Sequence, residues 1–281
     1  MNERFFWRKM SKKDVFRVED LLRDMEDGCV TACGRYLARE PSGDSVWMLC
    51  GGKNEFFAVL VNSRSTLIPV LCGMNEIPRP LFLKNFFRLK KIHSVQGLKN
   101  EVLVLEKEME RFGKKVSEII DYDLMCIERP PINKVNPQEV NIVLRVPKLA
   151  DLNALAPLQA AYEQEEVLHR GSVFSPAASR INLANIIKTG RILAAELNGR
   201  LVGKINVNAV SFTKYQVGGV YVHPDYRRLG IARRMACEFI TSLTGEGRGV
   251  TLFVKKANLP ARRLYSGLGF TARGDYRITY Y

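Results

Sequence analysis

The chain has 281 residues, 46% of them hydrophobic and 26% charged, a composition typical of one large or two ordinary globular domains. It has no run of about 18 apolar residues and no apolar signal-peptide core near its start, so we expect neither a membrane span nor secretion. Six cysteines form no CxxC pair and only three histidines accompany them. This argues against a metal site and favours a reducing, cytoplasmic location.

The formal net charge is +14 and is unevenly distributed. Residues 1–137 contribute +4, whereas residues 138–281 contribute +10. The excess indicates an anionic ligand for the second half: a nucleotide-like cofactor, a nucleic acid or an acidic surface. A solvated basic surface without any ligand is the alternative.

The first half begins with a pattern that returns later. Arg8 and Asp14 have the same spacing as Arg145 and Asp151, and each pair joins the end of a predicted strand to an amphipathic helix. WMLCGGKNEFFAVLV resembles LAAELNGRLVGKINV, since both are strand, glycine turn and strand. DYDLMCIE near the end of the first half parallels DYRITYY at the end of the second. Several matches in one order predict two copies of one fold, with chance similarity as the alternative.

A proline-rich stretch separates the two copies. ERPPINKVNPQE, residues 128–139, has three prolines and no apolar periodicity, as expected for a linker. We therefore predict two domains, residues 1–137 and residues 138–281.

The second copy predicts alternating strands and helices. In chain order these are a strand at 140–146, a helix at 151–164, a mixed loop and helix region at 165–190, a hairpin at 191–210, a strand at 215–222, a helix at 231–244, a strand at 250–255, a helix at 258–270 and a strand at 275–281. This order predicts the α/β class, with a mixed central β-sheet flanked by helices in each copy.

A cluster of arginines stands where a strand passes directly into a helix, in GGVYVHPDYRRLGIARRM. The first turn of a helix leaves backbone N–H groups unpaired, and these can bind phosphate oxygens. Gly230 and Ala232 keep side-chain bulk away from that turn. Positive charge is supplied by Arg227, Arg228, Arg233 and Arg234. The segment predicts a phosphate or pyrophosphate site, although it is neither a Walker loop nor GxGxxG.

A second motif, NLPARRLYSGLGF, predicts a short helix with one distinctive face. Asn258 suits the N-cap, and at about 100° per residue Ala261 and Tyr265 share its face. That face offers an amide, a small gap and a phenol to an extended ligand. A core helix with a surface tyrosine is the alternative.

Together the two motifs resemble the GNAT acetyltransferase superfamily. The Arg-x-x-Gly-x-Ala loop at 227–232 is similar to its pyrophosphate loop, and the Asn, Ala and Tyr at 258–265 are similar to its later signature. The resemblance covers about residues 140–281. It looks like the tandem type, in which the N-terminal copy is degenerate.

The resemblance implies that an amine attacks acetyl-CoA directly. Backbone groups of Val220 and Val222 would hold the pantetheine arm, and a backbone N–H there would polarise the thioester carbonyl. The N–H groups of Arg228, Gly230 and Ala232 would hold the pyrophosphate.

The following helix would complete the site. By the same resemblance, Asn258 would bond the pantetheine arm beside Ala261, and Tyr265 would protonate the leaving thiolate. No metal is implied.

The general base is not evident, because the strand YQVGGVYV lacks the glutamate that many family members have there. By the family layout, Glu165 and Glu166 are the nearest acidic candidates, and either could take the amine's proton through a water. Glu196 on a hairpin strand is another option, whereas a histidine before a proline, as at His223, is more often structural or near the cofactor. Solvated surface carboxylates are the alternative.

The N-terminal copy lacks this chemistry. In CGMNEIPRPLF, Pro78 and Pro80 remove N–H donors and Glu76 would repel a phosphate. Its later helix, LKNEVLVLEKEMERFG, carries glutamates and no tyrosine. We expect a structural or acceptor-shaping domain without a second acetyltransferase site.

Several acceptors and two other functions stay open. The acceptor is a small-molecule amine or a peptide N-terminus, and the acidic YEQEE at 162–166 favours a cationic amine. A tandem aminoacyltransferase using aminoacyl-tRNA is a second enzyme hypothesis, but the intact CoA motifs argue against a nucleic-acid partner. A non-catalytic acyl-CoA-binding regulator is the third. A homodimer is left open.

Overall fold

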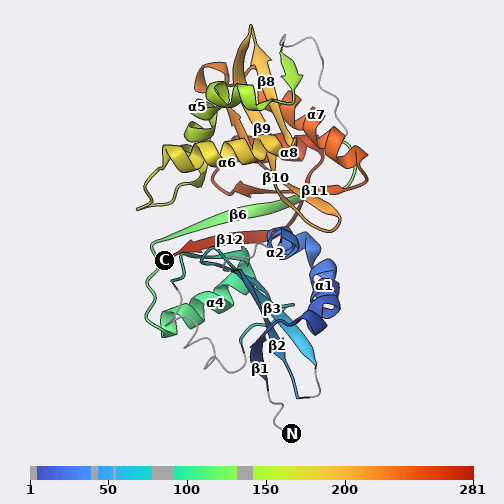
Figure 1. The fold of residues 1–281 in the computed structure, drawn as a ribbon, viewed down its shortest axis with the longest axis vertical. Helices are drawn as coiled ribbons and strands as arrows, with labels where there is room; N and C mark the ends of the chain where they lie inside the picture. Colours follow the sequence, from blue (N-terminus) through green and yellow to red (C-terminus); the bar gives the residue numbers. More distant parts are fainter. Residues whose placement is uncertain (1–4, 39–43, 53–54, 78–90, 132–141) are drawn as a thin grey trace.

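The structure is a computed structural model that describes residues 5–38, 44–52, 55–77, 91–131 and 142–281. Within these ranges, twelve strands form one mixed sheet and seven α-helices flank it, which confirms the α/β expectation (Figure 1). The expected domain boundary between residues 137 and 138, and the prolines at 78 and 80, lie outside the described residues.

The first half of the chain supplies six of the strands. They are β1 (Phe6–Lys9), β2 (Ser45–Cys50), β3 (Phe56–Ser63), β4 (Thr66–Val70), β5 (Ser94–Leu98) and β6 (Glu118–Ile127). Its described helices are α1 (Val15–Asp24), α2 (Glu26–Ala38) and α4 (Lys99–Arg111).

The second half supplies the other six strands. They are β7 (Val143–Arg145), β8 (Ile192–Leu197), β9 (Arg200–Val210), β10 (Lys214–Val222), β11 (Gly249–Lys255) and β12 (Thr271–Tyr280). Its helices are α5 (Leu152–Tyr162), α6 (Pro176–Lys188), α7 (Ile231–Gly245) and α8 (Leu259–Leu268). A single π-helical turn, Glu163–Val167, follows α5.

The two-copy prediction is confirmed at the start of each copy. Arg8 forms a two-pronged ion pair with Asp14, with N–O distances of 2.6 and 2.5 Å. Arg145 forms the same pair with Asp151, at 2.8 and 2.9 Å. In both copies the aspartate also accepts a backbone N–H from three residues earlier, so each pair fastens the strand to the turn that begins the helix.

The two copies exchange their last strands, a feature that the sequence did not predict. The sheet order is β1-β2-β3-β4-β5-β12-β6-β11-β10-β9-β8-β7. Strand β6 therefore pairs with β11 of the second half, and β12 pairs with β5 of the first. In Figure 1 the two strands run side by side between the halves. Tyr122 and Tyr276, equivalent in the two repeats, are opposite each other in register.

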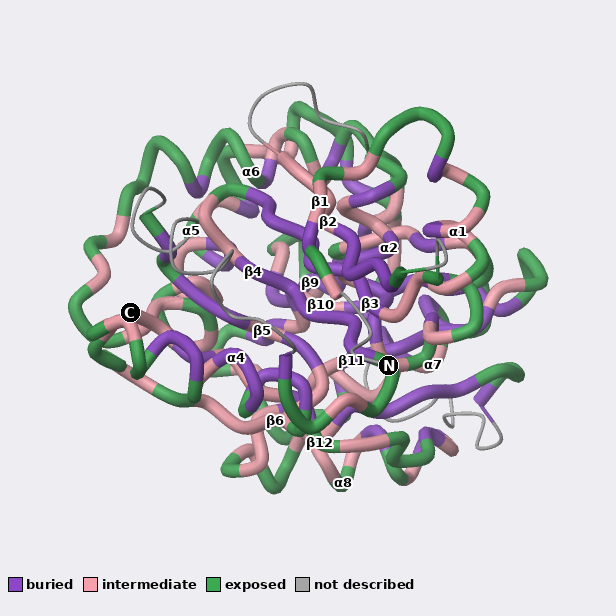
Figure 2. Tube along the Cα trace, turned by 90° about the horizontal axis from the view of Figure 1, so that it is seen from below, coloured by how far each residue is buried: buried purple, intermediate pink, exposed green. Residues whose placement is uncertain are grey.

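Helices cover both faces of the sheet in each half. In the first half α1 and α2 pack on one face and α4 on the other, so Val59 and Val61 contact one layer while Leu60 contacts the second. In the second half α5 and α6 cover one face, and α7 and α8 the other. Figure 2 shows the buried strands enclosed by helices whose outer sides are exposed.

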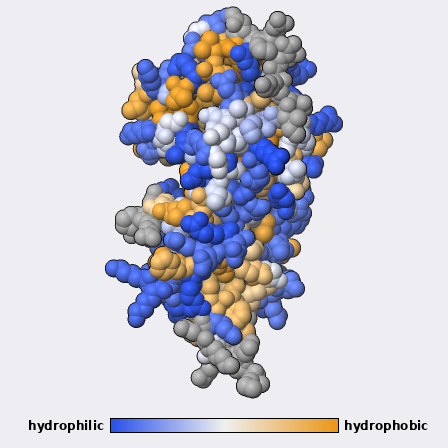
Figure 3. Space-filling model, turned by 90° about the vertical axis from the view of Figure 1, so that its right-hand side faces the viewer, coloured by the Kyte–Doolittle hydropathy of each residue, from blue (hydrophilic) through white to orange (hydrophobic). Residues whose placement is uncertain are grey.

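One face of the molecular surface is mainly hydrophilic, as expected when the hydrophobic side chains are packed between sheet and helices. On the face seen in Figure 3, hydrophilic residues cover most of the surface, and hydrophobic residues gather near its upper and lower ends. Among the described helices none is long and apolar enough to cross a bilayer.

Candidate active site

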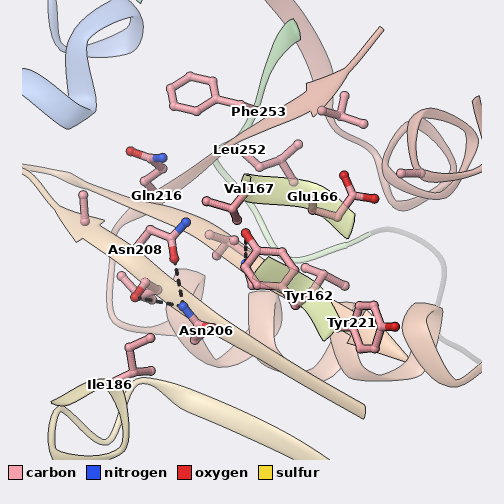
Figure 4. A pocket seen from close by; sticks show the side chains of 18 of the residues that line it. Tyr162, Glu166, Val167, Ile186, Asn206, Asn208, Gln216, Tyr221, Leu252 and Phe253 are labelled. Carbon is pink, nitrogen blue, oxygen red and sulfur yellow. Dashed lines mark hydrogen bonds between the residues drawn. The ribbon is translucent and has the colours of Figure 1, made fainter. Parts of the chain in front are cut away.

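A cleft of about 1580 Å³ lies where the two halves meet. The second half builds most of its wall, with residues of α5, α6, α7, α8, β9, β10, β11 and β12. The first half contributes residues of α2, together with Gln96 of β5 and Tyr122 of β6. Figure 4 shows part of this wall from close by. The exchange of strands is what brings α2, β5 and β6 to the cleft.

The strands β10 and β11 separate beside the cleft. Their parallel ladder ends where Val217 faces Leu252, although β10 continues to Val222. On the other side of β10, the ladder with β9 passes over Gly219 and Val220, which form a bulge. The predicted residues Val220 and Val222 both line the cleft. Their backbone groups are therefore placed where a ligand can enter the gap between the strands.

The N-terminus of α7 opens into the same cleft. Gly230 is its N-cap, with a left-handed φ of 73°, and no side chain of the described residues caps the helix. Arg228 also has a positive φ, 64°, which is uncommon for a residue with a side chain. Arg227, Arg228, Gly230 and Ala232 all line the cleft. The first-turn N–H groups of α7 therefore have no side-chain cap at the cleft, as an anion site requires.

The side chain of Arg227 is already engaged. Its Nη2 lies 2.9 Å from Glu165 Oε2, and its Nε donates to the carbonyl oxygen of Val222 at 3.1 Å. Arg227 therefore joins the end of β10 to the π-helical turn.

The helix α8 places the second motif as predicted. Asn258 is its N-cap, and its Oδ1 accepts the backbone N–H of Ala261 at 3.1 Å. Tyr265 is buried against Phe270, with ring centroids 5.6 Å apart. Burial, with smaller effects of the nearby Tyr162 and Glu166, raises the pKa of Tyr265 well above its usual range. Asn258, Ala261 and Tyr265 line the cleft together.

The two predicted acidic residues have different surroundings. Glu165 accepts hydrogen bonds from the hydroxyl of Tyr221 and from Arg227, and these lower the pKa of its carboxyl. Glu166 pairs with Lys255 at 3.2 Å and faces the cleft (Figure 4). Both line the cleft, but only Glu165 is held by the strand that carries the bulge.

The other candidate base, Glu196, and His223 lie elsewhere. Glu196 pairs with Arg145 at 2.8 Å on the outer strands β7 and β8. His223 is exposed and stands edge-on to Tyr226, with ring centroids 5.7 Å apart. Neither is among the described residues that line the cleft.

A polar row on β9 is not part of either sequence motif. Lys204, Asn206 and Asn208 alternate with apolar residues and so project from the same face of the strand. Asn206 donates to Asn208 Oδ1 at 2.9 Å, and both amides line the cleft beside Tyr162 (Figure 4). In the sequence, the alternation KINVN places polar side chains along one face of a strand that is otherwise apolar, and this pattern could have indicated a polar row.

The first half contains a filled counterpart of this site. Its strands β4 and β5 are also parallel, and their ladder includes only Thr66 with Ser94 and Leu67 with Val95. Just beyond the end of β4, a buried carboxylate from α4 takes the backbone donors. Glu101 Oε1 accepts the N–H of Leu71 at 2.7 Å and that of Cys72 at 3.1 Å.

Residues 158–270 match the profile of the Acetyltransferase (GNAT) family. A search of curated proteins finds no match. The matched range begins in α5 and ends after α8, so it includes the cleft-lining parts of the second half.

Solved structures share the fold along the whole chain. A GCN5-related N-acetyltransferase from Sphaerobacter thermophilus is 20% identical with a TM-score of 0.63, over 98% of this chain and 94% of that one. A Drosophila protein is 13% identical with a TM-score of 0.70, over 98% of both chains. A tandem GNAT protein from the clavulanic acid biosynthesis pathway is 14% identical with a TM-score of 0.62, again over 98% of both. At these identities the likeness is one of fold.

Proposed function

Because residues 158–270 match the profile of the Acetyltransferase (GNAT) family, we propose that the chain is an N-acetyltransferase that transfers the acetyl group of acetyl-CoA to a primary amine. The active site belongs to the domain of residues 138–281. The observation that carries the proposal is the meeting of an uncapped helix N-terminus, at α7, with the gap between β10 and β11 in one cleft. A phosphate group and an extended arm require those two features at one place.

The residues of the cleft fit acetyl-CoA. The N–H groups at the start of α7, near Arg228, Gly230 and Ala232, would hold the pyrophosphate. The backbone of Val220 and Val222 would hold the pantetheine arm, and the N-capped start of α8 would border it. When bound, acetyl-CoA supplies the activated acyl group.

Two side chains of the cleft are suited to proton transfer. Tyr265 is a phenol at neutral pH, since the usual tyrosine pKa of about 10 already ensures this and burial raises it further, so it holds a proton that it can donate to the leaving thiolate. Glu166 is the proposed base, acting through a water. Its negative charge contributes to the raised pKa of Tyr265, so it lies near the proposed acid. Glu165, with its lowered pKa, is better suited to hold the π-helical turn against β10.

The domain of residues 1–137 would shape the acceptor side of the cleft. Thr31 of α2 donates to Gln216 Oε1 at 2.7 Å, which joins the two halves inside the wall. Arg35 of the same helix also lines the cleft. Glu101 supports the absence of a second acetyl-CoA site, since it occupies the donors at the end of β4.

The proposal is tested by following thiol release from acetyl-CoA with a panel of amines: polyamines, amino acids, amino sugars and peptides. Calorimetric titration should give about one acetyl-CoA per chain. Gly230→Glu should abolish binding, because it puts bulk and negative charge at a left-handed N-cap where N–H groups must approach phosphate. A stoichiometry of two, or binding retained by Gly230→Glu, contradicts the proposed site.

A non-catalytic acyl-CoA-binding regulator is the second candidate. It is favoured by one observation: both predicted carboxylates are paired with cations, Glu165 with Arg227 and Glu166 with Lys255. Saturable acetyl-CoA binding without thiol release for any amine in the panel would support it.

A further inference from the structure

Lys204 is a fully buried lysine next to the bulge of β10. Its exposed fraction is 0%, and it does not itself line the cleft. Lysine is rarely buried completely unless its ammonium is fully hydrogen-bonded. The groups that contact the Lys204 side chain therefore indicate its role.

Three electron-rich groups surround the Lys204 ammonium. Nζ donates to the carbonyl oxygen of Gly219 at 2.8 Å and to Asn206 Oδ1 at 3.2 Å. It also lies 4.7 Å from the centroid of the Tyr162 ring, which is a cation–π distance. An ammonium has three N–H bonds, and each has a partner here. Burial lowers the pKa of Lys204 to about 7, while the charge of Glu163 opposes this change.

The carbonyl that Lys204 binds belongs to the peptide unit of the bulge. The oxygen of Gly219 and the N–H of Val220 are parts of one planar trans unit, so they point in opposite directions. A carbonyl drawn towards Lys204 therefore turns the Val220 N–H away from β9. Val220 is paired in neither ladder of β10 and lines the cleft.

Only a glycine at position 219 leaves room for the contact with Lys204. Its φ is +60°, and a Cβ there would lie 2.9 Å from Lys204 Nζ and would overlap Asn206. Its own N–H donates to the hydroxyl of Tyr162 at 3.3 Å. The two peptide units that flank Gly219 are thus both held, one by Tyr162 and one by Lys204.

We propose that Lys204 is a positioning residue for acetyl transfer, which aims the Val220 N–H at the thioester oxygen and strengthens it as a donor. The inference rests on the proposed function. A hydrogen bond that Nζ donates to the carbonyl oxygen draws electron density from the peptide unit, so the N–H at its other end becomes more positive. Such a donor stabilises charge that develops on the thioester oxygen during the reaction.

Lys204→Met tests the proposal, because methionine fills similar space without a charge or a donor. Removing one donor of this kind typically costs about 10²- to 10³-fold in kcat, and Lys204 acts through another group, so we expect kcat to fall by at least about tenfold. The KM for acetyl-CoA should change by less than about threefold, since the N–H acts mainly during the reaction.

Lys214→Met is the matched control. Like Lys204, Lys214 is a buried lysine, 8% exposed, but it lies at the start of β10. It pairs with Asp27 at 2.7 Å and with Glu128, away from the cleft. The Lys214→Met substitution removes a buried charge where the two halves meet. The stability of the protein should therefore fall while kcat stays within about twofold. A merely structural Lys204 would give the same pattern as this control.

The outcomes separate the inference from the function on which it rests. If the unmodified protein releases no thiol with any amine, the proposed function fails. If it turns over and folded Lys204→Met keeps kcat within about threefold, only the positioning role is rejected. Should Lys204→Met not fold, Lys204→Leu, which is also without a donor, is measured in the same way. Failure of both to fold rejects the inference in favour of a structural role.

Discussion

At the scale of single residues, Tyr265 is the side chain whose surroundings best match a chemical role. It is buried in the cleft wall, and burial raises the pKa of its phenol further above neutral pH. Tyr265→Phe removes the proton but retains the ring that packs against Phe270. General acid catalysis contributes about 10²- to 10⁴-fold, so kcat should fall by that order if thiolate departure limits the rate. Steady-state kinetics of the purified variant measure this.

The control for this variant is acetyl-CoA affinity, which should be almost unchanged because the hydroxyl acts after binding. A melting curve establishes that the variant is folded. If kcat falls by less than about threefold between pH 6 and 9, single-turnover rates decide whether another step hides the effect. A normal single-turnover rate would end the assignment of Tyr265 as the acid.

At the scale of elements, the two copies differ most where their middle strands end. In the second half the gap beyond β10 is open to the cleft, whereas beyond β4 the carboxylate of Glu101 binds two backbone N–H groups. Burial raises the pKa of Glu101 to about 7, although the two N–H groups oppose the rise. In the first half, a side chain of the protein itself therefore binds the backbone N–H groups at this place.

Glu101 should make the stability of the protein depend on pH. Its folded pKa is above the unfolded value, so the folded state binds the extra proton and stability falls as the pH rises from about 4.5 to about 7. The change should be on the order of 2–3 kcal/mol. Glu101→Gln keeps an acceptor oxygen without a charge and should remove this part of the pH dependence. Urea unfolding between pH 5 and 8.5 measures it.

Glu110→Gln is the control, since Glu110 is exposed on the same helix, α4. It should follow the unmodified protein at every pH, which separates the effect of Glu101 from that of other titrating groups. Parallel curves for Glu101→Gln and the unmodified protein would show that Glu101 does not titrate in this range.

At the scale of the whole molecule, the halves depend on each other for their sheets. Strand β6 lies between β11 and β12, and β12 lies between β5 and β6. Residues 142–281 alone would leave the edge of β11 unpaired and β12 without a neighbour. We therefore expect this fragment to aggregate or to melt without cooperativity, which circular dichroism and gel filtration would detect.

The matched control is the full chain with a protease site placed within residues 132–141. After cleavage the two pieces should still elute as one complex and bind acetyl-CoA, because the strands remain exchanged. A fragment of residues 142–281 that melts cooperatively at the temperature of the full chain would contradict the dependence.

Features set by neighbouring residues could be predicted from sequence. The N-cap of α8 at Asn258, the glycine at the start of α7 and the repeated arginine–aspartate pairs all rely on groups a few positions apart. Turn and cap chemistry acts over such distances, so residue order alone is enough to indicate it. The GNAT resemblance followed because its two motifs are also local.

Only the tertiary structure shows which residues far apart in the sequence come into contact. Thr31 meets Gln216 across 185 positions, and Glu26 binds the backbone N–H of Thr213 at 2.8 Å across 187. The exchange of β6 and β12, the wall that α2 gives the cleft and the place of Lys204 next to the bulge arise in the same way. Such contacts depend on which strands become neighbours, and strand order is settled by packing of the whole sheet, which no local pattern encodes.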